Sequence, residues 1–258
     1  MRLWPRLLST VFTADNVQEV LTLIGPPFRA LFLYGSYARG DADDASDIDI
    51  LQVTPVHTAP YAVGPLNVTC YTFDQLLRLA RRGSLFARHL VDEARALADP
   101  EDLLGTLKSA YVAPPNYHSV INEVIGCAGL LVVEEYEFNE NPEGLSSLVG
   151  YMARTYLYAS AFDQGACSFA MGHILELLGQ YTAGIILSSV RQRRFSAFIE
   201  ARRLFGELTG ATCRRIEGSL EAFIVNASAR NDLAMILGLR LLARGRPFTY
   251  DALHEVEL

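Results

Sequence analysis

The segment from Leu31 to Val53, LFLYGSYARGDADDASDIDILQV, limits the folds open to this chain more than any other stretch. Its first part is a short apolar run that ends at Gly35, which predicts a buried strand. Its last part, Asp47 to Val53, begins by alternating aspartate with isoleucine and predicts a second strand. Ten residues, Tyr37 to Ser46, join the two. We therefore expect the turn at Gly35 to lie beside the start of the second strand in one sheet.

The neighbouring segments complete an α/β unit. Asn16 to Ile24 space their apolar residues as a helix does, and Pro26 and Pro27 end that helix. Asn67 to Thr72, NVTCYT, is rich in strand-forming residues and predicts a third strand. After it, apolar residues three and four apart predict helices over 73–82, 84–98 and 100–111, with Asp74, Ser84 and Asp99 as N-caps.

The stretch Ala113 to Asn116, APPN, is the clearest domain boundary. Beyond it strand-like patterns are nearly absent, and helical spacing of apolar residues dominates. We therefore predict an α/β (α+β) domain at residues 1–112 and an all-α helical-bundle domain at residues 113–258.

Charge and composition exclude several classes of protein. Half of the residues are hydrophobic, so a packed core is expected instead of disorder. The net charge of −7 disfavours general binding to duplex nucleic acid. The first twelve residues, interrupted by Pro5 and Arg6, do not resemble a secretory signal, and no apolar run reaches the about 20 residues of a membrane span. We expect a soluble, cytoplasmic protein that acts without a membrane, with a homodimer left open.

Arginines are concentrated between Arg191 and Arg246, a window with eleven of them against five acidic residues. Solvated helix faces explain such a window, and so does a surface that faces phosphate or a partner. Phe195, Phe198 and Phe205 lie among these arginines, so the window could also hold an RNA acceptor by stacking its bases. The pattern does not separate a binding stripe from a core face, and an RNA acceptor is the interpretation that we favour least.

Four residues of the first segment suggest a chemistry. Gly35 allows the backbone to approach a ligand, and the Ser36 hydroxyl and the amides that follow can donate hydrogen bonds to phosphate oxygens. Asp47 and Asp49 are two apart on a predicted strand, so both carboxylates point to one side, which suits Mg²⁺. A solvent-facing acidic turn would also explain the aspartates, but it would not explain the glycine–serine turn before them.

This pattern, GS followed by ten residues and then DxD, resembles the polymerase-beta-like nucleotidyltransferase superfamily. The resemblance implies a mixed sheet flanked by helices, a nucleoside triphosphate donor, and transfer of a nucleoside monophosphate to a hydroxyl. We expect AMP from ATP, and an aminoglycoside-like small molecule or a protein as acceptor. The implied site residues are Asp47 and Asp49 for catalysis and Mg²⁺, with Gly35, Ser36, Arg39 and Ser46 for the nucleotide. Arg39 could equally be a solvent-facing turn residue.

The helical domain more loosely resembles the C-terminal domains of aminoglycoside nucleotidyltransferases and HEPN-like domains.

The chain departs from this superfamily at the third carboxylate, which completes the metal site and helps to deprotonate the acceptor. The corresponding strand is NVTCYT, so Asn67 or Thr69 takes that place, and an amide cannot accept a proton. The base could come from the helical domain, with Glu134 and Glu135 as candidates, or it could be Asp74. If none of them serves, we expect a degenerate nucleotidyltransferase that acts as a nucleotide-binding or regulatory module.

Overall fold

The computed structural model describes residues 14–25, 27–43, 46–227 and 232–242. The first twelve residues, for which we expect no secretory signal, and the end of the arginine-rich window beyond residue 242 lie outside the described residues. The chain divides into two compact units. The first consists of residues 1–115 together with Ser168–Ala170, and the second consists of residues 116–167 and 171–258. No sequence pattern predicts that Ser168–Ala170 belongs to the first unit.

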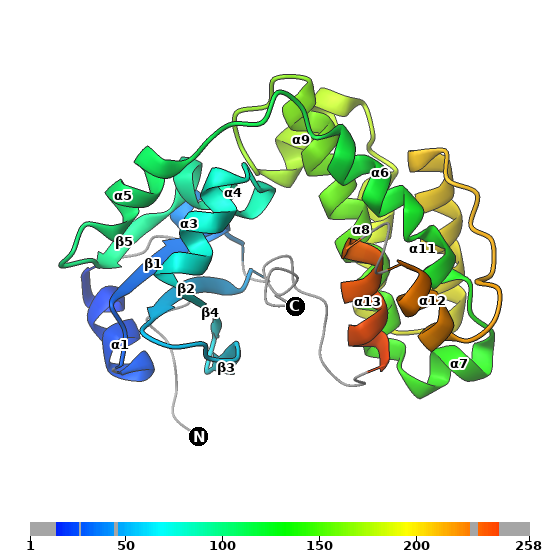
Figure 1. Ribbon diagram of the computed structural model, residues 1–258, viewed down its shortest axis with the longest axis horizontal. Helices are drawn as coiled ribbons and strands as arrows, with labels where there is room; N and C mark the ends of the chain where they lie inside the picture. Colours follow the sequence, from blue (N-terminus) through cyan, green and yellow to red (C-terminus); the bar gives the residue numbers. More distant parts are fainter. Residues whose placement is uncertain (1–13, 26, 44–45, 228–231, 243–258) are drawn as a thin grey trace. The chain divides into compact units, whose positions relative to one another are not determined.

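A five-stranded mixed sheet forms the centre of the first unit (Figure 1). Its strands are β1 (Ala30–Tyr34), β2 (Ile48–Thr54), β3 (Tyr61–Val63), β4 (Leu66–Thr72) and β5 (Arg95–Ala98), in the order β3-β4-β2-β1-β5. β2 and β4 run parallel, and the other neighbours run antiparallel. The predicted mixed sheet is confirmed, and β1, β2 and β4 are the three strands that the sequence predicts.

The helix predicted over residues 84–98 is too long. α4 (Leu85–Glu93) ends at Ala94, whose backbone is extended, and the next four residues form β5. This strand pairs antiparallel with β1. Without it, the backbone of β1 would form an open edge of the sheet, so pairing outweighs the helical preference of alanine and leucine. The short strand β3 was also not predicted, because its three residues are flanked by turn formers.

Helices cover both faces of this sheet (Figure 1). α1 (Ala14–Ile24) packs with Val20 against the face that carries Leu33 and Ile50. α3 (Phe73–Arg81) and α4 lie on the opposite face, where the ring of Phe86 contacts those of Tyr34 and Tyr71. Because side chains alternate along a strand, Asp49 belongs to the same face as Tyr34, its partner in register.

Capping groups decide where the helices of this unit begin. Thr72 and Gln75 form a capping box at the start of α3, so Asp74 lies in the first turn and is not the cap that was predicted. Ser84 caps α4 as predicted. α5 (Leu103–Ala110) begins later than predicted, yet the Asp99 carboxylate still accepts two backbone N–H groups of its first turn.

In its described residues the second unit consists of helices and the loops that join them (Figure 1), which confirms the all-α prediction. Its longest helix, α8, is buried along most of its length, as expected of a helix surrounded by others. No described helix of the chain has the length and apolarity that crossing a membrane requires. The α-helices are α6 (His118–Gly126), α7 (Glu135–Glu140), α8 (Pro142–Asp163), α9 (Met171–Leu178), α10 (Ala183–Ser189), α11 (Phe195–Thr209), α12 (Leu220–Ala227) and α13 (Asp232–Leu242), with 3₁₀ helices η1 (Ala128–Leu131) and η2 (Val190–Gln192).

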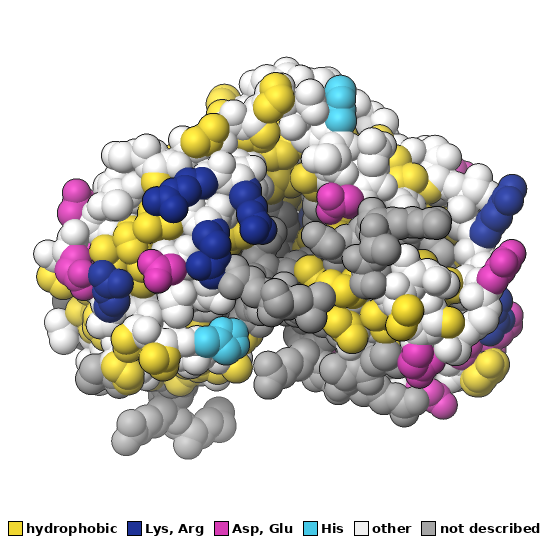
Figure 2. All heavy atoms as spheres, viewed as in Figure 1, with side chains coloured by type: hydrophobic (Ala, Val, Ile, Leu, Met, Phe, Trp, Pro, Cys, Tyr) yellow, Lys and Arg dark blue, Asp and Glu magenta, His cyan; other side chains and the backbone are white. Residues whose placement is uncertain are grey.

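The phenylalanines of the arginine-rich window belong to the core of the second unit. Phe198 and Phe205 are buried, and Phe195 and Phe198 both contact the ring of Phe138. Side chains packed in this way cannot stack on RNA bases, so they do not support an RNA acceptor. Basic side chains are not confined to this unit: Figure 2 shows several over α3 and α4, and Arg81 and Arg82 are exposed there.

Candidate active site

Gly35 forms a tight turn between β1 and the short helix α2 (Ser36–Arg39). Its φ of 74° and ψ of −157° lie in a region that only glycine adopts readily. A β-carbon at this position would lie 2.7 Å from Oδ2 of Asp49, closer than carbon and oxygen can approach. The sequence thus needs glycine here for two reasons, the backbone conformation and the neighbouring carboxylate.

Asp49 lies next to this turn because of the pairing of β1 with β2. Its register partner is Tyr34, the last residue of β1. The flanking Ile48 and Ile50 are buried in the opposite direction, while the Asp49 side chain is half-buried. Asp47 is exposed and precedes β2, which begins one residue later than predicted. The predicted juxtaposition of the turn and the aspartates is therefore present for Asp49.

Asn67 takes the position at which the third carboxylate is expected. It is the register partner of Asp49 in the parallel pair β2–β4, and its Nδ2 donates to Asp49 Oδ1 over 3.2 Å. Thr69, the other residue considered, is buried and its hydroxyl lies 3.2 Å from the hydroxyl of Tyr34. The strand thus presents an amide, which cannot accept a proton, beside Asp49.

The donor atoms at this end of β2 and β4 suit one Mg²⁺ ion. Asp47 and Asp49 offer carboxylate oxygens, and the side chain of Asn67 carries a carbonyl oxygen. Within the described ranges, no three His, Cys, Asp or Glu side chains gather as a metal site. Mg²⁺ commonly binds through one or two carboxylates together with phosphate oxygens and water. These side chains therefore offer the oxygen donor types that a single Mg²⁺ ion uses.

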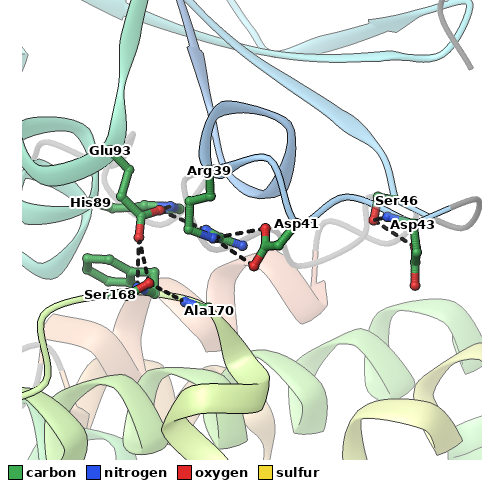
Figure 3. A network of polar contacts seen from close by, with 9 residues as sticks. Arg39, Asp41, Asp43, Ser46, His89, Glu93, Ser168 and Ala170 are labelled. Atoms are coloured by element: carbon green, nitrogen blue, oxygen red, sulfur yellow. Dashed lines mark hydrogen bonds and ion pairs between the residues drawn. The ribbon is translucent and has the colours of Figure 1, made fainter. Parts of the chain in front are cut away.

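Arg39, at the end of α2, is held by two carboxylates (Figure 3). Its Nε lies 3.1 and 3.2 Å from the two oxygens of Asp41, and its Nη1 donates to Glu93 Oε2 over 2.7 Å. The side chain is only 18% exposed. Among the described residues these contacts engage Nε and Nη1 and do not engage Nη2. Arg39 is thus not a freely solvated turn residue.

Glu93, the last residue of α4, is a buried carboxylate with several partners. Oε2 lies 3.0 Å from His89 Nε2 as well as close to Arg39, and Oε1 accepts the N–H of Phe169 over 2.8 Å. Burial alone raises the pKa of Glu93, but His89, the Phe169 N–H and Arg39 together lower this pKa to about 2. Glu93 is therefore ionised near neutral pH, and a carboxylate with so low a pKa is a weak proton acceptor there.

Ser46 does not point to the turn at Gly35. Its hydroxyl donates to Asp43 Oδ1 over 2.7 Å and accepts the N–H of Asp43 over 2.9 Å (Figure 3). This pair closes the loop before β2 on itself. The predicted contact of Ser46 with a nucleotide stays a prediction.

The candidate bases lie in different surroundings. Asp74 lies beyond the far end of β4, in the first turn of α3, and its role as the base stays a prediction. Glu134 caps α7 and accepts from Arg215 over 2.9 Å, and Glu135 is exposed. That either glutamate supplies the base stays a prediction.

Three residues near Arg39 were missed by sequence reasoning. His89 and Glu93 lie four apart on a helix, a spacing that brings side chains together and could have suggested the pair. Phe169 gave no comparable signal, because 76 positions separate it from Glu93. Long-range contacts of this kind follow from the fold and not from local pattern.

Comparison with known proteins tests the family. No curated protein matches the chain. A family model matches part of the first unit, whereas the GS and DxD motif assignment and the loose resemblance of the helical unit stay predictions. That model, the nucleotidyltransferase domain, matches residues 21–110, and this similarity supports nucleotidyl transfer as the general chemistry of the first unit.

Proposed function

We propose that the protein transfers a nucleoside monophosphate, AMP from ATP, to a hydroxyl of an aminoglycoside-like small molecule or of a protein, with Mg²⁺ as cofactor. One observation carries this proposal: the backbone of Gly35 lies so close to the Asp49 carboxylate that no β-carbon fits between them. A glycine turn of this kind lets phosphate approach the backbone, and the carboxylate beside it suits the accompanying cation. General nucleotidyl transfer is supported by the family match.

Four side chains at and beside the turn have roles in this proposal. The Ser36 hydroxyl, half-exposed at the start of α2, donates a hydrogen bond to a phosphate oxygen. Arg39 offers Nη2 to the same triphosphate, with its other nitrogens fixed by Asp41 and Glu93. Asp47 and Asp49 hold Mg²⁺, which when bound neutralises phosphate charge and steadies the leaving pyrophosphate.

The acceptor hydroxyl must lose a proton, and neither Asn67, beside Asp49, nor Glu93, beside Arg39, is suited to accept it. Asn67 cannot accept one, and the pKa of Glu93 is held at about 2. Lack of a positioned base costs roughly 10²–10⁴ in rate, so slow turnover is expected unless the base comes from elsewhere. Glu135, exposed at the start of α7, remains a candidate from the helical unit.

A second function is favoured by the hydrogen bond from Asn67 to Asp49. It replaces the charge repulsion of two adjacent carboxylates by an attractive contact, which stabilises the site without a metal. A unit arranged in this way can bind a nucleotide and yet transfer it poorly. In this alternative the protein is a nucleotide-binding or regulatory module.

Calorimetry with a non-hydrolysable ATP analogue and Mg²⁺ tests the binding site. The double variant Asp47→Asn with Asp49→Asn should lose the magnesium-dependent affinity by at least about 100-fold, because both anionic ligands are gone. Asp92→Asn, an exposed aspartate on α4, serves as the control for charge and should bind as wild type does. Equal affinity of the double variant and wild type would refute the assignment.

Labelled ATP, GTP, CTP and UTP with Mg²⁺ and candidate acceptors distinguish the two functions. Pyrophosphate release that requires Asp49 supports the transferase. Tight nucleotide binding without release, across aminoglycosides and tyrosine-containing proteins, supports the module instead.

A further inference from the structure

The first unit includes three residues from a distant part of the chain, Ser168–Ala170. They follow α8 in sequence and precede α9. Their contacts with α4 centre on the Glu93 carboxylate, whose Oε1 accepts the Phe169 N–H over 2.8 Å and lies 3.4 Å from the Ser168 hydroxyl (Figure 3). The same hydroxyl accepts the N–H of Ala170 over 3.1 Å, which folds the segment into a compact turn.

Phe169 anchors this segment by its side chain. It is 1% exposed, and its ring stacks on that of His89 with centroids 4.3 Å apart and planes at 24°. His89 in turn contacts the ring of Tyr34 edge to face and lies 3.0 Å from Glu93 Oε2. An aromatic side chain buried to this degree supplies most of the energy of such a docked segment.

The two oxygens of Glu93 divide their partners between the segment and the turn. Oε1 faces Phe169, and Oε2 faces Arg39 and His89. A carboxylate with only 7% of its side chain exposed must have its lone pairs satisfied, since an unpaired buried charge is strongly unfavourable. Because the Phe169 N–H fixes one oxygen, the orientation of the other, and with it the position of Arg39, depends on the segment.

We propose that Ser168–Ala170 completes the nucleotide-binding unit by locking Glu93, which acts as the positioning residue for Arg39. The part of this inference that concerns phosphate rests on the proposed function. Residues 21–110, the range of the family match, therefore lack one component of the site. The locked Arg39 presents Nη2 to the phosphates of the donor, so the segment contributes to triphosphate affinity although it does not touch the nucleotide.

The lock can be tested without any ligand through the Arg39 side chain. In full-length wild-type protein, the Nη1–H group of Arg39 should give a resolved NMR signal that exchanges slowly with water, because Nη1 donates to Glu93 Oε2. Phe169→Ala and Glu93→Gln should each accelerate this exchange at least about tenfold. Asp92→Asn, next to Glu93 but exposed and paired with Arg88, should leave the exchange unchanged.

Two further observations keep this test decisive. Phe169→Leu retains an apolar anchor and should restore part of the protection, which a general loss of structure would not do. If Phe169→Ala does not fold, the comparison of Phe169→Leu with wild type replaces it. Unchanged Arg39 exchange in a folded Phe169 variant would overturn the proposal.

Nucleotide binding then tests the phosphate contact. Glu93→Gln and Phe169→Ala should weaken MgATP binding about tenfold and leave AMP binding nearly unchanged, because only the donor's outer phosphates meet Arg39. In turnover assays the same variants should raise KM more than they lower kcat. Wild-type protein that binds no MgATP would refute the proposed function but not the lock. If wild type binds MgATP and both variants bind it with the same affinity, the contact of Arg39 with phosphate is refuted.

Discussion

Two clusters of arginine and glutamate, one in each unit, contain the same residue types in different surroundings. In the first unit, Arg39 and Glu93 are 18% and 7% exposed, and a backbone N–H also binds the carboxylate. In the second, Arg203 pairs with Glu200 and Glu207 along α11, and all three side chains are at least half exposed. Water screens the second cluster and not the first, so only the first fixes a side chain in place.

This difference changes how the arginine-rich window should be interpreted. Its high count of arginines suggested a surface for phosphate or a partner, yet Arg193, Arg203 and Arg215 each pair with exposed glutamates. The described part of the window therefore favours solvated helix faces. Arg39 of the first unit, which does not belong to an arginine-rich window, is held more tightly than these three. Burial and backbone partners identify a functional charge better than the number of charges does.

The largest expected effect is a loss of MgATP affinity on substitution of Gly35 in the first unit. Gly35→Ala introduces a β-carbon 2.7 Å from Asp49 Oδ2 and forces a strained backbone, at a cost of about 1–3 kcal/mol. The carboxylate must move aside, so we expect at least a roughly 100-fold loss of MgATP affinity, because a metal ligand misplaced by about 1 Å loses most of its contribution. Calorimetry measures this loss.

Gly40 provides the matched control for Gly35. Its φ is also positive, at 85°, but a β-carbon there meets nothing within 4 Å. Gly40→Ala should lower stability by about 1 kcal/mol and leave nucleotide affinity unchanged. Equal affinity losses for both alanine variants would mean that backbone strain, and not contact with Asp49, sets the requirement at Gly35.

The second largest expected effect is on the unfolding free energy, to which the Glu93 carboxylate contributes in a pH-dependent way. Its pKa is lowered from 4.5 to about 2 in the folded protein, so the ionised carboxylate stabilises the fold above pH 4.5 and this contribution disappears as pH falls toward 2. Glu93→Gln should therefore lose roughly 2 kcal/mol of unfolding free energy at pH 7, after allowance for partial screening. The gap to wild type should narrow between pH 4.5 and 2, as urea unfolding at several pH values will show. A gap that does not depend on pH would refute the charge-based account.

A smaller effect is expected when the missing carboxylate is restored. Asn67→Asp places a second negative charge beside Asp49, which costs about 1 kcal/mol without metal and strengthens the attraction for Mg²⁺. The rise in Tm on adding Mg²⁺ should therefore be larger in this variant than in wild type. Increased pyrophosphate release in the same variant would favour the degenerate module as the state of the natural chain. Asn67→Ala separates loss of the hydrogen bond from gain of charge.

The sequence predicts those features that depend on neighbouring residues. β1, β2, β4 and the turn at Gly35 follow from short patterns, because a buried strand, a glycine turn and an alternating strand each leave a local trace. β5 was mistaken for helix, since its identity comes from pairing with β1 and not from its own residues. The lock at Glu93 was missed for the same reason: Phe169 reaches it only through the folded chain.

The smallest effect is expected at Arg203, and it tests the other half of the comparison. Its pKa is raised by hydrogen bonds to Glu200, yet half of the side chain is exposed to water, so the shift does not translate into stability. Arg203→Ala should leave Tm within about 1 °C of wild type, and 0.5 M salt should remove any remaining difference. Differential scanning fluorimetry at low and high salt measures both. A clear loss of stability that persists in salt would show that α11 uses its charges as the first unit does, and exposure would then no longer distinguish a functional charge from a solvated one.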